Sequence, residues 1–227
     1  MVVVDDGIAT GGTVHAAIRS VRAFNLTDWG RLDEALDEWA TALQLSRSAA
    51  NPRRIAWALG FGGWAQVRAG EQETAASWLR ECLQLLSRSG WISFRPWPAA
   101  VLAEAELVVG HPDLVLDLHQ EFALSCQLAD PSLESATARA LALQIAGGGD
   151  TGGALTWVDE ARRRVGRETD VCVGMQGAIL ATDIELSTRQ GAGDRAAASA
   201  RTLLELAART HMDGYLDLAM TALRPAR

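Results

Sequence analysis

Cysteine is scarce in this sequence of 227 residues, with single residues far apart at Cys82, Cys126 and Cys172. An odd number of widely spaced cysteines fits neither a disulfide framework nor the ligand spacing of a zinc site. Each cysteine falls within a helix-like apolar pattern, so we expect small core residues in a reducing compartment. The cysteine content therefore favours a cytoplasmic protein.

Long apolar runs are lacking as well. No uninterrupted stretch approaches the roughly 18 apolar residues that indicate a membrane-spanning helix. The N-terminus has no positively charged segment followed by an apolar stretch, which is the pattern of a signal peptide. We therefore expect no membrane span, no membrane partner and a cytoplasmic location.

Positive charge is in deficit, because 21 Lys and Arg residues face 28 Asp and Glu residues, which gives a net charge of −7. Nucleic-acid-binding domains are usually basic, so we expect no direct nucleic-acid partner. The one tight basic run, residues 162–164, lies near a predicted helix C-terminus, where cations suit the helix dipole. The four histidines are scattered without metal-ligand spacing, and we expect no metal and no cofactor.

What the sequence does contain is a regular series of glycine corners between apolar-striped segments. Within residues 55–86, two helical stripes meet at Ala69-Gly70-Glu71, which leaves no room for a loop. A glycine relieves the strain of such a tight reversal. Similar corners follow one another at spacings of 40, 40, 39 and 44 residues, near Gly30, Gly70, Gly110, Gly149 and Gly193. A near-constant period predicts a stack of antiparallel helix pairs.

Small residues take fixed positions around these corners. Around Gly70, the small residue Gly63 lies seven positions before, and Ala75 and Cys82 lie five and twelve after, with the bulky Leu79 between them. Small side chains let two helices cross closely, and the larger side chain fills the remaining gap. The first and fourth units repeat the pattern with Ala23, Ala35, Trp39 and Ala42, and with Ala142, Ala154, Val158 and Ala161.

Two units depart from this pattern. After Gly110 the corresponding positions hold Val115, His119 and Phe122, which are larger. The last unit fits only if its turn has two extra residues, which would give these positions to Ala200, Leu204 and Ala207.

The spacing resembles that of the tetratricopeptide repeat family, although its period exceeds the roughly 34 residues of the standard repeat. The longer period resembles the helical regions of large bacterial LuxR-type ATPase regulators. The resemblance implies an all-α fold over residues 14–227, in which antiparallel helix pairs form a right-handed superhelix. Residues 213–224 would be a terminal capping helix, because the last repeat has no neighbour.

The resemblance also implies a concave face, built mainly from the first helix of each pair, that binds a protein or peptide. Six aromatic or charged residues fall at positions that would line it: Trp57, Trp64, Arg68, Trp97, Glu104 and Arg139. Aromatic and Arg side chains dominate binding hot spots, so this groove suits a peptide or a small amphipathic ligand. Alternatively, Trp57 and Trp64 are core residues between repeats.

The expected function is a non-catalytic protein-interaction or ligand-sensing module, part of or derived from a transcriptional regulator. The ATPase and helix-turn-helix domains of LuxR-type regulators have no counterpart in the sequence, and neither does the Lys/Asn carboxylate clamp of chaperone-tail-binding repeats. The sequence is also compatible with a homodimer. The proline-interrupted connector, residues 87–100, contains Trp91, Phe94 and Trp97, which could line a ligand pocket.

Residues 1–13 differ from the rest and indicate a short apolar strand followed by a glycine-rich loop. A helix then follows, with Thr13 as its N-cap and Val14, Ala17, Ile18 and Val21 on one face. The string DDGIATGGT closely resembles the diphosphate-sugar-binding signature of type I phosphoribosyltransferases. The resemblance implies that Asp5 and Asp6 hold ribose hydroxyls and that a loop cradles the 5′-phosphate through Ala9, Thr10, Gly11, Gly12 and Thr13.

This transferase reading is an alternative function for the chain. A transferase of that family needs a parallel sheet with crossover helices. No second β-rich run follows Phe24, so residues 1–13 also fit an orphan remnant of another domain.

A second motif, Asp150-Thr151-Gly152, matches the active-site triplet of aspartic proteases but follows a predicted helix. There we expect a glycine turn with Asp150 or Thr151 as the cap of the next helix.

Overall fold

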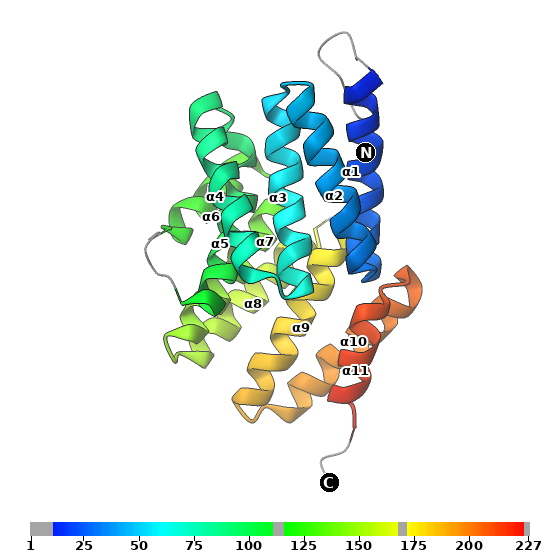
Figure 1. Cartoon of the computed structure of the whole chain (residues 1–227). Coiled ribbons are helices and arrows are strands. Elements are labelled where there is room, and N and C mark those ends of the chain that lie inside the picture. The colour runs from blue at the N-terminus through cyan, green and yellow to red at the C-terminus, as the bar shows by residue number, and fades with distance from the viewer. Residues whose placement is uncertain (1–10, 111–115, 168–171, 225–227) are drawn as a thin grey trace. The chain divides into compact units, whose positions relative to one another are not determined.

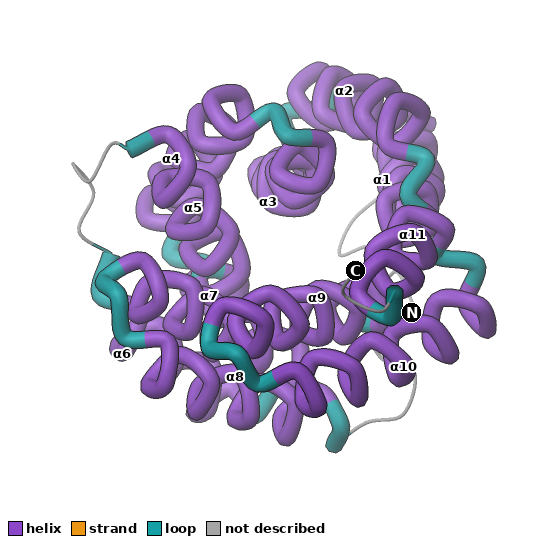
Figure 2. Tube along the Cα trace, turned by 90° about the horizontal axis from the view of Figure 1, so that it is seen from below, coloured by secondary structure: helices purple, strands orange, loops and turns teal. Residues whose placement is uncertain are grey.

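The computed structural model describes residues 11–110, 116–167 and 172–224, and 86% of these residues are helical, with no strand among them. The prediction of an all-α fold is confirmed (Figure 1). In the described part the helices follow in the order α1 (Gly11–Trp29), α2 (Leu32–Ser48), α3 (Pro52–Ala69), α4 (Gln72–Ser89), the 3-10 helix η1 (Ile92–Phe94), α5 (Pro96–Val109), α6 (Leu118–Leu128), α7 (Pro131–Gly147), α8 (Thr151–Val165), α9 (Val173–Arg189), α10 (Gly193–Thr210) and α11 (Asp213–Ala222). Short connections join most of them (Figure 2). None of these helices is long and apolar enough to cross a membrane.

The helices group into two compact units that meet in the sequence at Gly110. In unit 1, which contains α2 to α5 and most of α1, α3 packs against α2, α4 and α5. In unit 2, which contains α6 to α11, α7 packs against α6 and α8, and α9 packs against α8 and α10. The helix pair expected around Gly110 is therefore divided between the two units. Residues 111–115, which include Val115, lie outside the described residues.

Glycines in the left-handed region mark five corners of the chain. Their φ angles lie between 74° and 92°, at Gly30, Gly70, Gly110, Gly149 and Gly191, and a sixth left-handed glycine, Gly90 (φ 67°), caps the end of α4. Residues with a Cβ atom rarely adopt this conformation, which is why glycine recurs there. Four of these corners are at the predicted residues. At the last one the left-handed residue is Gly191, and Gly193 instead begins α10.

Small residues at the predicted offsets are buried where the second helix of a pair crosses the first. Ala35, Ala75 and Ala154 each lie five residues after their corner and are fully buried. In the last hairpin the earlier corner moves this position to Ala196, which is also buried. α6 differs, because it buries Leu118, Glu121 and Ser125, whereas His119 is exposed and Phe122 is half-buried.

Asn–Pro and Asp–Pro pairs begin helices that follow the hairpins. The side chain of Asn51 accepts a hydrogen bond from the Arg54 backbone N–H (3.1 Å), and Pro52 is the first residue of α3. Asp130 caps α7 in the same way before Pro131. Asp150 accepts from Gly153 N–H (2.8 Å) and caps α8, as the sequence predicts.

The first helix differs from its prediction in two respects. It begins at Gly11, so residues 11–13 form a helical turn instead of a loop and Thr13 is not the N-cap. Residues 1–10, with the rest of the proposed phosphate and ribose site, lie outside the described residues. The expected apolar face is wrong for Val14, Ile18 and Val21, which are exposed.

The buried face of α1 consists instead mainly of small residues, among them Ala16, Ser20 and Ala23, with Leu26 buried farther along the helix. This face lets α1 lie close to α2. Their contact is visible in the hydrogen bond from Trp39 Nε1 to Thr27 Oγ1 (3.3 Å). A close crossing favours small side chains over branched ones, so the small-residue face packs inward.

We predict that Gly63→Val lowers the free energy of unfolding by about 1–3 kcal/mol. A Cβ atom at Gly63 would lie 2.6 Å from Leu79 Cγ, so α3 and α4 would have to separate. Chemical denaturation measures the loss. Gly193→Val is the control, because no atom lies near its Cβ position. In a Leu79→Ala background the loss should shrink, and an equal loss in both backgrounds would contradict the close crossing.

Candidate interaction site

Aromatic side chains from four helices and η1 form a cluster in unit 1, and Phe61 on α3 lies at its centre. The Phe61 ring centroid lies between 4.6 and 6.2 Å from those of its five aromatic neighbours Phe24, Trp39, Trp57, Phe94 and Trp97. Tilted and edge-on contacts of this kind stabilise a core beyond simple burial. The cluster fixes α3 against its neighbours in unit 1.

Glycines on α3 make room for the rings of neighbouring elements. A Cβ atom at Gly60 would lie 2.9 Å from the Phe94 ring, and one at Gly62 would lie 2.7 Å from the Trp78 ring. Glycine inside a helix costs about 1 kcal/mol relative to alanine. The close ring contacts explain why the segment GFGGW nevertheless forms the middle of a helix.

The six predicted groove residues are divided between the two units. Trp64 and Trp97 are only 3% exposed, and their ring centroids lie 6.1 Å apart. Trp64 therefore occupies a core position, which is the alternative that the sequence left open for it. Trp57, Arg68 and Glu104 remain partly exposed, and the Arg68 guanidinium lies 5.8 Å from the Trp64 ring centroid.

The sixth residue, Arg139, belongs to α7 in unit 2. Its side chain is largely buried, and Nε donates to Thr182 Oγ1 (3.0 Å) and to the Ala178 carbonyl (3.3 Å), both on α9. Arg139 thus joins α7 to α9. Whether the partly exposed residues line a binding groove remains a prediction.

Part of the aromatic cluster extends to the surface of unit 1 through a stack of three rings. Trp57 stacks on Phe94, and Phe94 stacks on Trp91, with centroids 5.4 and 5.2 Å apart. The Arg53 guanidinium lies 5.7 Å from the Trp91 ring centroid, within cation–π range. The neighbouring Ile92 is 59% exposed. We refer to Arg53, Trp57, Trp91 and Ile92 together as the α3–η1 surface.

In unit 2 the carboxylate of Asp183 is fully buried and joins three helices. It accepts hydrogen bonds from Arg162 on α8 (2.6 Å) and from Ser199 and Arg195 on α10 (2.7 Å each). Burial alone would raise the pKa of Asp183. The hydrogen bonds from Ser199 and Arg195, with the charges of Arg195 and Arg162, outweigh burial and lower that pKa below its ordinary value.

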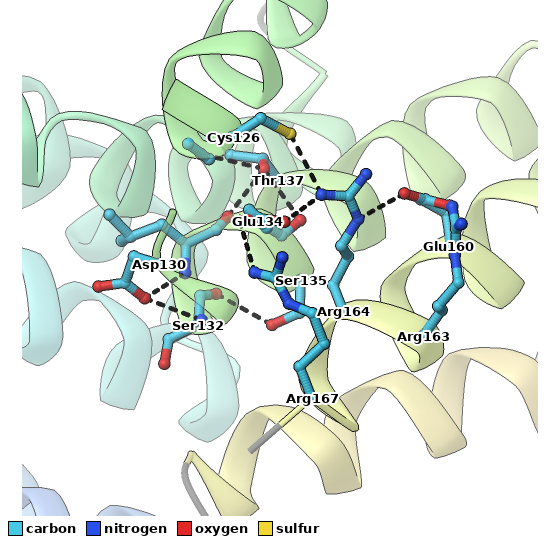
Figure 3. A network of polar contacts seen from close by, with 12 residues as sticks. Cys126, Asp130, Ser132, Glu134, Ser135, Thr137, Glu160, Arg163, Arg164 and Arg167 are labelled. Atoms are coloured by element: carbon cyan, nitrogen blue, oxygen red, sulfur yellow. Dashed lines mark hydrogen bonds and ion pairs between the residues drawn. The ribbon is translucent and has the colours of Figure 1, made fainter. Parts of the chain in front are cut away.

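A second buried carboxylate, Glu134 on α7, is the centre of the network in Figure 3. It pairs with Arg164 on α8 and with Arg167, whose Nη2 lies 2.6 Å from its Oε1. Arg164 Nε also donates to Glu160 (2.6 Å), and its guanidinium lies 5.2 Å from the Phe122 ring centroid on α6. Burial opposes the charge of Arg164, but its bonds and attraction to Glu134 prevail and raise its pKa.

Residues 162–164 lie in the last turn of α8, as the sequence predicts, and each of these arginines also has an acidic partner. Arg162 pairs with Asp183, Arg163 pairs with Glu160, and Arg164 pairs with Glu134. Successive helical residues point about 100° apart, so each guanidinium reaches a different partner. A signal in the sequence was available: Glu134 and Asp183 lie at positions where the surrounding helical pattern is apolar or small.

The networks act as structural clamps. The pKa of Asp183 is lowered, so this carboxylate stays ionised near neutral pH, whereas a general acid or base needs a pKa near the working pH. Among the residues that the structure describes, no group of three or more His, Cys, Asp or Glu side chains could hold a metal ion. No protein-family model matches the chain, and a search of curated proteins finds no similar sequence.

We predict that Asp183→Asn lowers the free energy of unfolding by about 3 kcal/mol at neutral pH, because it removes the buried partner of two arginines. In the folded protein the pKa of Asp183 lies below the value of about 3.9 that an aspartate has in the unfolded chain. The stabilisation by the ionised Asp183 is therefore complete above a pH of about 3.9 and is lost as the pH falls through the folded-state pKa. Denaturant titrations across this range should show the wild-type advantage shrinking in acid.

Asp159→Asn is the matched control for this prediction. Asp159 pairs with the same Arg195 (2.7 Å) but its side chain is 60% exposed, so its loss should change stability by less than about 1 kcal/mol. A gap between wild type and Asp183→Asn that stays constant down to strong acid would contradict the role given to the Asp183 charge.

Proposed function

We propose that this chain is a non-catalytic protein-interaction module built from hairpins like those of tetratricopeptide repeats, stacked as a right-handed superhelix. The repeated hairpin supports this proposal. The same arrangement, a left-handed glycine followed two residues later by a helix with a buried small residue, recurs at Gly30, Gly70, Gly149 and Gly191. Stacked hairpins of this kind present extended surfaces to which peptides and proteins bind.

The side chains that remain accessible in unit 1 suit such a role. Trp57 and Arg68 on α3 and Glu104 on α5 are each partly exposed. Trp and Arg are the residue types most enriched among binding hot spots. The Trp57 ring packs against Phe61 and Phe94, so this side chain loses little conformational entropy when a partner binds.

The wider context that we propose is regulatory. The period of about 40 residues, which resembles the helical region of LuxR-type ATPase regulators, supports a part in transcriptional control in the cytoplasm. In this role the module senses a partner, and other domains or chains carry out ATP hydrolysis and DNA binding.

Selection from an unbiased library of displayed 12-residue peptides tests the interaction function. We predict enriched peptides that bind the intact chain at a single class of site with micromolar affinity, about −8 kcal/mol. Enrichment no greater than on a stable helical protein without repeats would contradict the proposal. Isothermal titration of synthetic peptides supplies the affinity and the stoichiometry.

A second candidate function is binding of phosphoribosyl diphosphate, which rests on the string DDGIATGGT at residues 5–13. Only residues 11–13 of this string are described, and they form the first turn of α1. If the chain is an interaction module without this ligand site, phosphoribosyl diphosphate with magnesium leaves the melting temperature of the protein unchanged. A concentration-dependent rise that disappears in Asp5→Asn/Asp6→Asn would instead favour the transferase-related function, because a ligand that binds only the folded state stabilises it.

A further inference from the structure

The charge around the α3–η1 surface is opposite to that of the chain. Residues 51–57 and 87–97 contain four arginines and no Asp or Glu, in a protein whose net charge is −7. Arg53, Arg88 and Arg95 are exposed and Arg54 is half-buried. Helix ends of both signs meet here, because α3 and α5 begin and α2 and α4 end, so the arginines set the local charge. This end of unit 1 is therefore locally basic and attracts negative charge.

The same surface presents apolar groups that are held rigidly. Trp57 and Trp91 are half-buried and each stacks on the buried Phe94, which contacts Phe61 in the core. Ile92 follows Trp91 in the sequence and is largely exposed. Aromatic surface that is fixed before binding gives affinity at low entropic cost.

We propose that the α3–η1 surface, with Arg88 at its edge, is a docking site for an acidic peptide segment that carries an aromatic or branched aliphatic anchor. The anchor packs on Ile92 and the exposed edge of Trp91. The flanking carboxylates pair with Arg53 and Arg88. This inference rests on the proposed interaction function, to which it adds the chemistry of the partner and the surface that binds it. The α3–η1 surface shares only Trp57 with the groove predicted from the sequence.

Charge complementarity favours an acidic peptide over a nucleic acid. Nucleic-acid binding draws much of its affinity from several phosphate contacts, and here four arginines form a small basic area on an acidic chain. The half-buried rings of Trp57 and Trp91 already stack on Phe94. Ile92 is the more exposed apolar group of this surface, and it offers no stacking face or hydrogen bond to a base. An acidic peptide matches both the charge and the exposed apolar side chain.

The test uses peptides selected on the intact chain, with fluorescence anisotropy as the readout. We expect selected peptides to be enriched in Asp and Glu and to contain at least one large apolar residue. Their Kd should rise by about ten-fold or more in Arg53→Glu/Arg88→Glu and in Ile92→Asp. Circular dichroism and thermal unfolding establish that each variant remains folded.

Matched controls lie elsewhere on the surface. Arg201→Glu changes an exposed arginine on α10, and Leu218→Asp changes an exposed apolar residue on α11. Neither should alter the Kd. A labelled dT15 oligonucleotide serves as the nucleic-acid probe and should bind no more tightly than a neutral peptide.

The outcomes separate this inference from the interaction function. Peptides without acidic enrichment, or peptides that bind the α3–η1 variants as tightly as wild type, would overturn the acidic docking site and leave the interaction function standing. Salt-dependent dT15 binding that Arg53→Glu/Arg88→Glu abolishes would overturn it in favour of a nucleic acid. If no peptide is enriched, both proposals fall.

Discussion

Close approach of paired helices is the constraint on which the other features of this protein depend. A helix can cross its neighbour tightly only where one side of the contact is nearly bare, as at Gly63 against Leu79. The left-handed glycine at each corner allows the chain to reverse without a loop, so the two helices enter the crossing in fixed register. Because the small residues and the glycine depend on the same geometry, they recur together at the same spacing.

The two units reinforce this arrangement in different ways. In unit 1 the space around α3 is filled by aromatic rings, and ion pairs of the buried carboxylates Glu38 and Glu106 with Arg19 and Arg80 add to them. In unit 2 buried carboxylates on α7 and α9 are paired with arginines on α8 and α10. Ion pairs require specific geometry, so they fix the order in which helices adjoin. The aromatic core instead leaves rings at its edge, which is where the α3–η1 surface arises.

Much of the fold could be predicted from the sequence because its determinants are local. The corners follow from single glycines, and the buried positions Ala35, Ala75 and Ala154 follow from their distance to a corner. The last corner shows the limit. A glycine occurs at both Gly191 and Gly193, and the sequence does not say which one adopts the left-handed conformation. For α1, apolar and small-residue faces compete, and the tight crossing selects the small one.

The candidate site was harder to predict because its determinants are not local. Position in a repeat gave Trp64 as a groove residue, but whether an aromatic ring fills the core depends on the room left by Gly60 and Gly62 and on neighbours such as Trp97. The partners of Asp183 and Glu134 lie on other helices, and helical periodicity identifies a face without identifying what the face meets. The basic character at α3 and η1 likewise appears only when two separate segments are brought together.

The distance between spin labels on α3 and α4 tests the hairpin arrangement most directly. Labels at Arg53 and Arg88, with Cys126 and Cys172 replaced by serine, lie at the same end of an antiparallel pair. Cys82 should stay unlabelled, because burial and the charge of Glu81 raise the pKa of its thiol to about 12. The account predicts that the Arg53–Arg88 distance is shorter than the Arg53–Glu73 distance by more than about 10 Å, given the length of α4. Equal distances, or the opposite order, would contradict it.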